Sequence, residues 1–143
     1  MAHSMNDERG LRMRALEPER SLIVQAPAGS GKTTLLIHRM LRLLTTVKEP
    51  EQIIAITFTR KAAEEMRSRI IRELELACEE EPEDRFLRTG YSLARAVLTH
   101  DEQLSWNLIL HPSRLRIMTI DSLCASLVRQ MPLTARISGV QAV

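Results

Sequence analysis

One short stretch, residues 21–44, limits the possible folds more than any other part of the sequence. Residues 21–26 read Ser-Leu-Ile-Val-Gln-Ala and predict a buried β-strand, while residues 34–44 carry the apolar spacing of a helix. Between them lies a turn of small residues ending in Lys-Thr-Thr, and its members are Ala26, Pro27, Ala28, Gly29, Ser30, Gly31, Lys32, Thr33 and Thr34. A strand, a glycine-bearing turn, Lys-Thr and a helix in this order predict the phosphate-binding loop of a nucleoside triphosphatase.

Each part of this loop has a chemical reason. Small residues let the chain curl so that backbone N–H groups converge on a phosphate, and the start of the next helix adds further unpaired N–H groups. Lys32 is predicted to reach the β- and γ-phosphates and the Thr33 hydroxyl to ligate Mg²⁺, so both are candidate catalytic residues. Thr34 either contacts the α-phosphate or only packs at the helix start. The alternative is a glycine turn with a solvated Lys32, and the flanking pattern favours the phosphate loop.

The bulk composition is that of an ordinary globular domain, with 44% hydrophobic and 27% charged residues. No apolar run is long enough to span a membrane, so no membrane partner is expected. Cys78 and Cys124 lack the spacing of a metal site, which predicts two reduced thiols in a cytoplasmic protein. The net charge of +2 is too small to indicate nucleic-acid binding by itself. Residues 1–5 look like a leader added for expression, which leaves 6–143 as the predicted domain.

The rest of the chain alternates between strand and helix patterns. Residues 53–58 form an apolar run that predicts a strand buried on both faces of a parallel sheet. A third strand is expected over 116–120, and helices are expected over 7–16, 31–46, 60–77, 85–99 and 101–110. A last helix is expected to run to about residue 130, with Asp121 or Ser122 as its cap. This order predicts an α/β fold of the P-loop NTPase class, with a partial parallel sheet, flanking helices and a helical insertion at about 80–112.

Two further motifs indicate a family. Residues 55–70, Ala-Ile-Thr-Phe-Thr-Arg-Lys-Ala-Ala-Glu-Glu-Met-Arg-Ser-Arg-Ile, resemble motif Ia of the UvrD/RecB-like superfamily 1 DNA helicases. Residues 119–124, Thr-Ile-Asp-Ser-Leu-Cys, resemble the segment called Ib or Ic in that family, and residues 25–33 resemble its motif I. The motifs occur in the family's order and cover about residues 21–131. The long insertion makes the chain more similar to the RecB/AddA branch than to UvrD.

The resemblance implies a RecA-like ATP-binding domain with ATP and Mg²⁺ as cofactors and single-stranded or duplex DNA as a partner. It also implies DNA contacts, which fall on Thr57, Phe58, Thr59, Arg60, Thr119 and Ser122 of this sequence. From the residues alone, a core position is the favoured interpretation of Phe58, whereas the resemblance favours a DNA contact in which the ring would stack on a base. Asp121 stands where relatives often carry His, so helix capping is its expected role. The adenine-reading Gln that many relatives place upstream is absent, since the comparable position reads Asp7-Glu8-Arg9.

The family also needs parts that these residues do not supply. No Asp-Glu-x-Gln acid motif follows the third strand in these residues. They also contain no second RecA-like domain and therefore no arginine finger, a group that raises the hydrolysis rate by about 10³ to 10⁵. We therefore expect an ATP-binding part of an ATP-dependent DNA helicase/exonuclease that unwinds DNA in double-strand-break repair, inactive by itself. Its partners would be the rest of the helicase chain and a nuclease domain or partner subunit. Two alternatives are another P-loop enzyme, such as a small-molecule kinase or transporter ATPase, and a catalytically silent nucleotide-binding adaptor.

Overall fold

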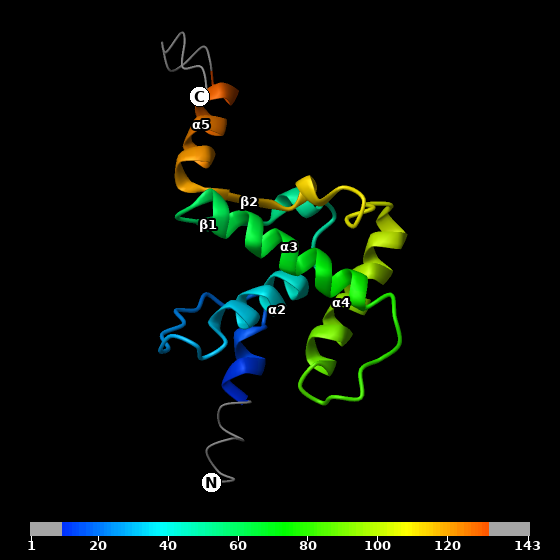
Figure 1. Ribbon diagram of the computed structural model, residues 1–143. Helices are drawn as coiled ribbons and strands as arrows, with labels where there is room; N and C mark the ends of the chain where they lie inside the picture. The colour runs from blue at the N-terminus through cyan, green and yellow to red at the C-terminus, as the bar shows by residue number, and fades with distance from the viewer. Residues whose placement is uncertain (1–9, 132–143) are drawn as a thin grey trace.

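The computed structural model describes residues 10–131, and Figure 1 shows their arrangement. A helical segment over 10–15 comes first. The elements that follow are α2 (Lys32–Leu44), the 3₁₀ turn η1 (Pro50–Gln52), β1 (Ile54–Thr57), α3 (Arg60–Leu76), α4 (Arg88–Leu104), the 3₁₀ turn η2 (Pro112–Arg114), β2 (Arg116–Thr119) and α5 (Ile120–Gln130). Among residues 10–131, no helix is long and apolar enough to cross a membrane.

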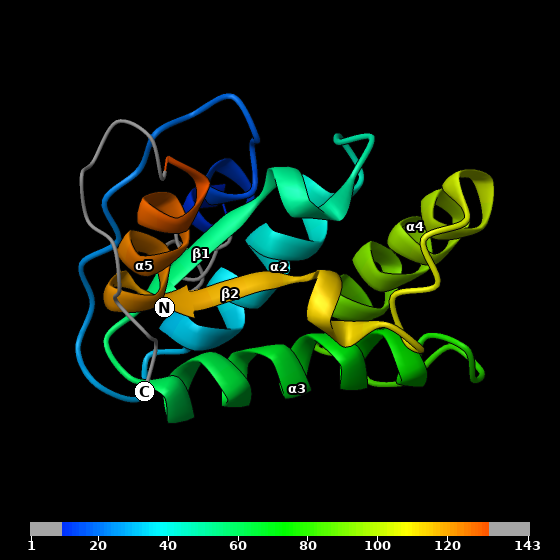
Figure 2. The same cartoon turned by 90° about the horizontal axis from the view of Figure 1, so that it is seen from above.

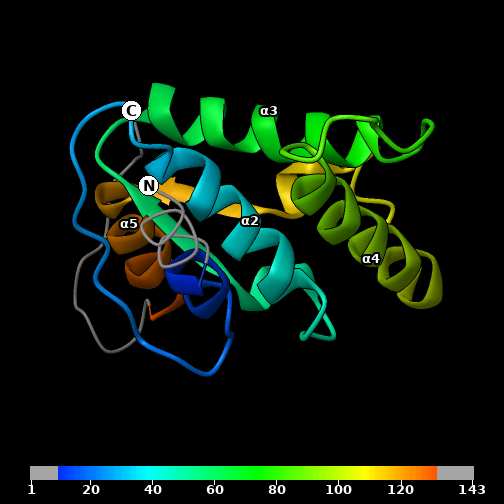
Figure 3. The same cartoon turned by 90° about the horizontal axis from the view of Figure 1, so that it is seen from below.

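The sheet consists of β1 and β2, which run parallel, with Ile54 opposite Arg116 and Thr57 opposite Thr119. Because parallel strands need a long crossover, α3 and α4 occupy the connection between them. Figures 2 and 3 show α3 running alongside both strands, with α5 at one end of the molecule and α4 at the other. The chain is therefore an α/β structure with a small parallel sheet.

The core lies where α2, α3 and α4 pack together beneath the sheet. In α2 the buried residues follow the i, i+3, i+4, i+7 spacing of one helix face. The buried apolar side chains of this core are Ile37, Met40, Leu41, Leu44, Ile53, Ala63, Ile70, Leu74, Ala77, Ala94, Val97, Trp106, Leu108, Leu115 and Ile117. Most of them come from residues 37–97, so the elements that flank the sheet are fixed by one continuous cluster.

Polar contacts attach the end of α4 to the turn before β1. His100 Nε2 lies 2.8 Å from the Val47 carbonyl oxygen, and Trp106 Nε1 donates to the Lys48 carbonyl at 2.9 Å. The two rings meet edge to face with centroids 5.0 Å apart. Asp101, which is buried, accepts hydrogen bonds from the backbone N–H groups of Asn107 at 2.6 Å and Leu108 at 3.1 Å.

Several expected elements are confirmed, namely the helices over α2, α3 and α5 and the strands over β1 and β2, whose ends lie within about three residues of the predicted ones. The expected strand at 21–26 is wrong. These residues form no strand, and Leu22, Ile23 and Val24 are 43%, 98% and 44% exposed. An apolar run becomes a strand only where a neighbour completes its backbone hydrogen bonds, and none of the described strands pairs with this segment.

Three further expectations are corrected by the structure. The two helices expected at 85–99 and 101–110 are replaced by the single helix α4, because the polar stretch around His100 makes tertiary contacts without ending the helix. This helix ends at Leu104, and residues 105–110 are not helical. The strand β1 is not buried on both faces, because Ile54 and Ile56 are 44% and 50% exposed. The cap of α5 is Thr119, whose hydroxyl accepts from the Ser122 N–H at 3.2 Å; Asp121 lies in the first turn of the helix.

Candidate functional site

The loop before α2 has the backbone shape that a phosphate-binding loop requires. Gly29 and Gly31 both have left-handed backbone angles, with φ of 77° and 80°, which glycine adopts without the steric cost that other residues meet. Gly31 is the N-cap of α2, and no side chain caps the helix. Two left-handed glycines two residues apart fold the chain tightly back on itself just where the helix begins.

This loop presents hydrogen-bonding groups that lack partners. Within the described residues, the backbone N–H groups of Lys32, Thr33 and Thr34 have no hydrogen-bond acceptor, as expected for the first turn of an uncapped helix. The Ser30 hydroxyl oxygen is buried and also has no partner. Unpaired donors at a positive helix end fit an anion with several oxygens, such as a phosphate group. The residues present therefore fit the polyphosphate part of a nucleotide.

The Lys32 ammonium group lies across the same loop. It donates hydrogen bonds to the carbonyl oxygens of Ala26 and Pro27, the latter at 2.9 Å. Thr33 and Thr34 are exposed in the first turn of α2, and Ala28 and Gly29 form the exposed tip of the loop. Residues 26–34, the expected nucleotide-binding residues, thus form one loop and the first turn of α2. The carbonyl groups of this loop hold the positive charge of Lys32.

A cavity of about 350 Å³ opens beside the loop. One wall is the helical segment 10–15, which contributes Leu11 and Arg12, and another is the irregular segment 22–26. Ser30 and Lys32 of the loop line the same cavity. Cavities of a few hundred Å³ with apolar walls and a few polar groups are typical of small-molecule sites.

Two arginines of this region carry contacts that the sequence patterns do not reveal. Arg12 Nη2 donates to the Ser30 carbonyl oxygen at 3.2 Å. Arg39 of α2 donates through Nη1 to the Ala15 carbonyl at 2.5 Å and through Nη2 to the Arg20 carbonyl at 2.6 Å. The Arg12 bond attaches the segment before the loop to the loop itself, and the Arg39 bonds attach that segment to α2.

A second group of expected residues gathers at the carboxyl edge of the sheet. Because Thr57 lies opposite Thr119, the residues that follow each strand emerge at the same edge. Phe58 is 98% exposed there, so the interpretation of Phe58 as a core residue is wrong. Arg60 is also exposed, at the start of α3.

The hydroxyl groups at this edge are held by helix caps. Thr59 Oγ1 accepts from the Ala62 N–H at 3.1 Å and so caps α3. Thr119 caps α5 and lies 2.9 Å, oxygen to oxygen, from the Ser122 hydroxyl. The turn after β1 and the loop before α2 lie at the same end of the molecule, as Figures 2 and 3 show. The structure thus brings two separate groups of expected residues to one end.

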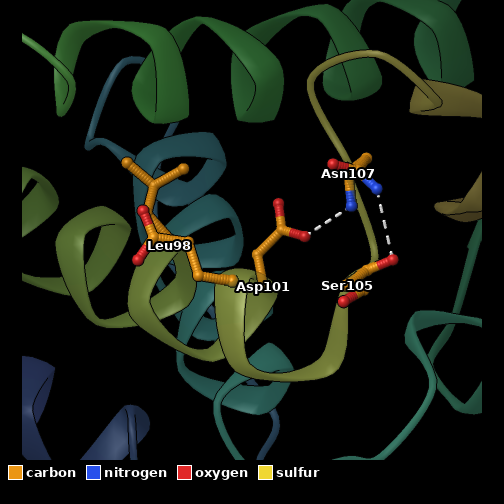
Figure 4. Close-up of a pocket in the computed structure, with 5 residues that line it drawn as sticks. Leu98, Asp101, Ser105 and Asn107 are labelled. Atoms are coloured by element: carbon orange, nitrogen blue, oxygen red, sulfur yellow. Dashed lines mark hydrogen bonds between the residues drawn. The ribbon is translucent and has the colours of Figure 1, made fainter.

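Other titratable groups lie away from these two groups. His38 of α2 is packed near Glu73 of α3, and burial lowers the pKa of its imidazole; Glu73 opposes this shift and the positive charge of Arg12 adds to it. A second cavity, of about 310 Å³, is lined by Asp101 and neighbours at the end of α4 (Figure 4). Among the described residues, no three His, Cys, Asp or Glu side chains are grouped to hold a metal ion, and both cysteines are exposed.

Comparison with known proteins places these features in a family. The family described as UvrD/REP helicase N-terminal domain matches residues 5–138. An ATP-dependent helicase/nuclease subunit of Lactobacillus johnsonii is 32% identical over 111 residues, covering 78% of this chain and 8% of that protein. The helicase/nuclease subunits of the same name from a Thermoanaerobacter species and from Moorella thermoacetica are 33% and 42% identical, over 76% and 48% of this chain and 8% and 5% of their own lengths.

The chain therefore spans less than a tenth of the length of these relatives. No solved structure matches it. The family match covers almost the whole chain and includes the loop before α2 and the carboxyl edge of the sheet. The chain belongs to the UvrD/REP helicase N-terminal domain family.

Proposed function

We propose that this chain is the ATP-binding part of an ATP-dependent DNA helicase/exonuclease of the RecB/AddA type, which unwinds DNA in double-strand-break repair in the cytoplasm. The observation that carries the proposal is the loop before α2, where backbone N–H groups and the buried Ser30 hydroxyl have no partners among the described residues and the Lys32 ammonium contacts two loop carbonyls. The names of the relatives, ATP-dependent helicase/nuclease subunits, support the same activity.

On the nucleotide side, Lys32 would exchange its two loop carbonyls for oxygens of the β- and γ-phosphates. This exchange replaces neutral acceptors with charged ones, so the hydrogen bonds become stronger. The N–H groups of residues 31–34 would bind the remaining phosphate oxygens. Mg²⁺, when bound, would neutralise charge on the phosphate oxygens, and the hydroxyl of Thr33, in the first turn of α2, would hold it.

On the DNA side, we propose that single-stranded DNA lies across the carboxyl edge of β1 and β2. Phe58 would stack on a base, because its ring is almost fully exposed. Thr59 caps α3 with an oxygen lone pair, which would leave its hydroxyl proton to donate to a phosphate oxygen. Thr119 and Ser122 share one hydrogen bond between their hydroxyl groups, so one proton of this pair would remain for a second phosphate contact. In this proposal, Thr57, Arg60 and Ser122 would make further contacts with the sugar–phosphate backbone of the DNA.

We further propose that the two-stranded sheet is part of a larger RecA-like parallel sheet. The exposed apolar side chains of residues 22–24 and of Ile54 and Ile56 support this, since a larger sheet would cover them. A second RecA-like domain, with its arginine, would close over the γ-phosphate and complete ATP hydrolysis. A nuclease domain or a partner subunit would complete the break-processing enzyme.

The experiment is an ATPase and unwinding assay on the longer protein that carries this domain, with and without single-stranded DNA. We expect DNA to stimulate hydrolysis, and Lys32→Ala to abolish both hydrolysis and unwinding. A rate of ATP hydrolysis that does not change when DNA is added would favour another P-loop enzyme, such as a kinase. Full activity in Lys32→Ala would favour a silent adaptor role for this domain and would contradict the proposal.

A further inference from the structure

The upstream helical segment, residues 10–15, contacts the phosphate-binding loop through one side chain. We propose that Arg12 is a positioning residue of the nucleotide site: its guanidinium holds the Ser30–Gly31 peptide so that the Gly31 N–H group is directed toward the phosphates. This inference rests on the proposed nucleotide function, and it adds a residue that lies outside the motifs of the loop itself.

The contact geometry places the guanidinium directly against this peptide. Arg12 Nη2 donates to the Ser30 carbonyl oxygen at 3.2 Å. A Cβ atom built on Gly31 would lie 3.5 Å from Arg12 Nη2 and 3.6 Å from Arg12 Nη1. Both terminal nitrogens therefore lie against the Ser30–Gly31 unit, and Arg12 lines the same cavity as Ser30, Gly31 and Lys32.

Peptide geometry turns this contact into an orientation. In a planar trans peptide, the carbonyl of one residue and the N–H of the next point in opposite directions. Holding the Ser30 carbonyl toward Arg12 therefore directs the Gly31 N–H away from it. Within the described residues this N–H has no acceptor, so it remains available to an anion. Gly31, with its left-handed φ of 80°, has little steric resistance to rotation, so the Arg12 contact restricts a peptide that its own side chain does not fix.

The charge of Arg12 acts in the same region. A guanidinium stays protonated throughout the physiological range, so Arg12 and Lys32 together place two positive charges at the loop. The field of Arg12 also extends to α2, where it contributes to the lowered pKa of His38. The two positive charges at the loop favour a polyanion over a neutral ligand.

Hydrogen bonds from Arg39 hold the segment that carries Arg12 in place. The segment that carries it is attached to α2 by Arg39, which donates to the Ala15 and Arg20 carbonyls. The helix α2 also carries the unpaired N–H groups of residues 32–34. The same helix therefore contributes to the nucleotide site and holds the segment that carries Arg12. Support of this kind keeps hydrogen-bond donors correctly oriented before the ligand arrives.

The test is calorimetric binding of Mg-ATP, Mg-ADP and adenosine to the full 143-residue chain and its variants. We expect Arg12→Ala to weaken ATP and ADP binding by roughly tenfold or more, as for loss of a charge-assisted hydrogen bond, with adenosine binding unchanged. Arg12→Lys should recover only part of the loss, because an ammonium lacks the planar fork of donors. Arg14→Ala, an exposed arginine of the same segment, is the matched control and should bind like wild type.

Circular dichroism verifies that each variant is folded. If Arg12→Ala does not fold, Arg12→Gln, which keeps donors without the charge, takes its place in the comparison. Binding of ATP by the variant within twofold of wild type, or an equal loss for adenosine, would overturn the role of Arg12 while leaving the proposed function intact. Failure of the wild-type chain itself to bind ATP would overturn both.

Discussion

Thr57 and Thr119 are register partners in the parallel pair of β1 and β2, so each strand leads into a capped helix at the same sheet edge. The same edge carries threonine and serine hydroxyl groups and one exposed aromatic ring, that of Phe58. The arrangement is the physical basis of the proposed DNA contact.

We predict that Phe58→Ala weakens binding of single-stranded DNA by about 1–3 kcal/mol, the usual contribution of one base stacked on an aromatic side chain. Stability should hardly change, because the ring is 98% exposed. The measurement is fluorescence anisotropy with a labelled oligonucleotide at fixed salt. Phe86, which is 86% exposed before α4, provides the matched control Phe86→Ala. Equal effects of the two substitutions would exclude a stacking role for Phe58.

The buried carboxylate of Asp101 is predicted to stabilise the turn after α4, which Figure 4 shows in close-up. Asp101→Ala leaves the N–H groups of Asn107 and Leu108 without acceptors and should lower the free energy of unfolding by about 2–4 kcal/mol. Asp101→Asn keeps one acceptor oxygen and should fall between. Urea denaturation gives the values. The exposed neighbour Glu102 supplies the control Glu102→Ala, and an equally large effect there would refute the role of Asp101.

The environment of His38 predicts a pH dependence of stability. Burial lowers its pKa in the folded state below the ordinary value of 6.5, against the opposing charge of Glu73 and with the help of Arg12. Gly90 of α4 brings no charge to this junction, where a Cβ would lie 2.9 Å from His38 Nε2. As the pH falls through 6.5, the unfolded chain takes up a proton first, so the free energy of unfolding decreases.

The measurement is urea denaturation at several pH values between about 5 and 7.5, the range in which histidine titrates. His38→Gln should reduce the slope of stability against pH, because the glutamine cannot be protonated. His111→Gln replaces an exposed histidine and should keep the wild-type slope. An unchanged slope in His38→Gln would show that other groups cause the acid sensitivity.

Much of the fold can be predicted because its signals are local. The apolar runs of β1 and β2 and the helical patterns of α3 and α5 lie within the elements that they define. The loop before α2 is equally predictable, since its glycines are required by its own backbone angles. The conformation of residues 21–26 cannot be predicted in the same way, because apolar side chains do not indicate whether a partner strand is present.

The errors at α4 and the missed arginines share one physical cause. His100 and Asp101 look like a polar break, yet their side chains bond to residues 47, 107 and 108. Arg12 and Arg39 bond to backbone carbonyls 18 to 24 residues away, and every residue type has the same backbone carbonyl. Such contacts depend on tertiary packing, so no sequence spacing marks them.

The most direct test of the central claim is calorimetric titration of Mg-ATP into the 143-residue chain, with Lys32→Ala alongside. Lys48, exposed beyond the end of α2, gives the charge-matched control Lys48→Ala. We predict that the wild-type chain and Lys48→Ala bind with the same affinity, and that Lys32→Ala binds at least about tenfold more weakly, as expected for loss of a charge-assisted contact. Absence of binding by the wild-type chain, or equal binding by all three proteins, would contradict the account of the loop as a nucleotide site.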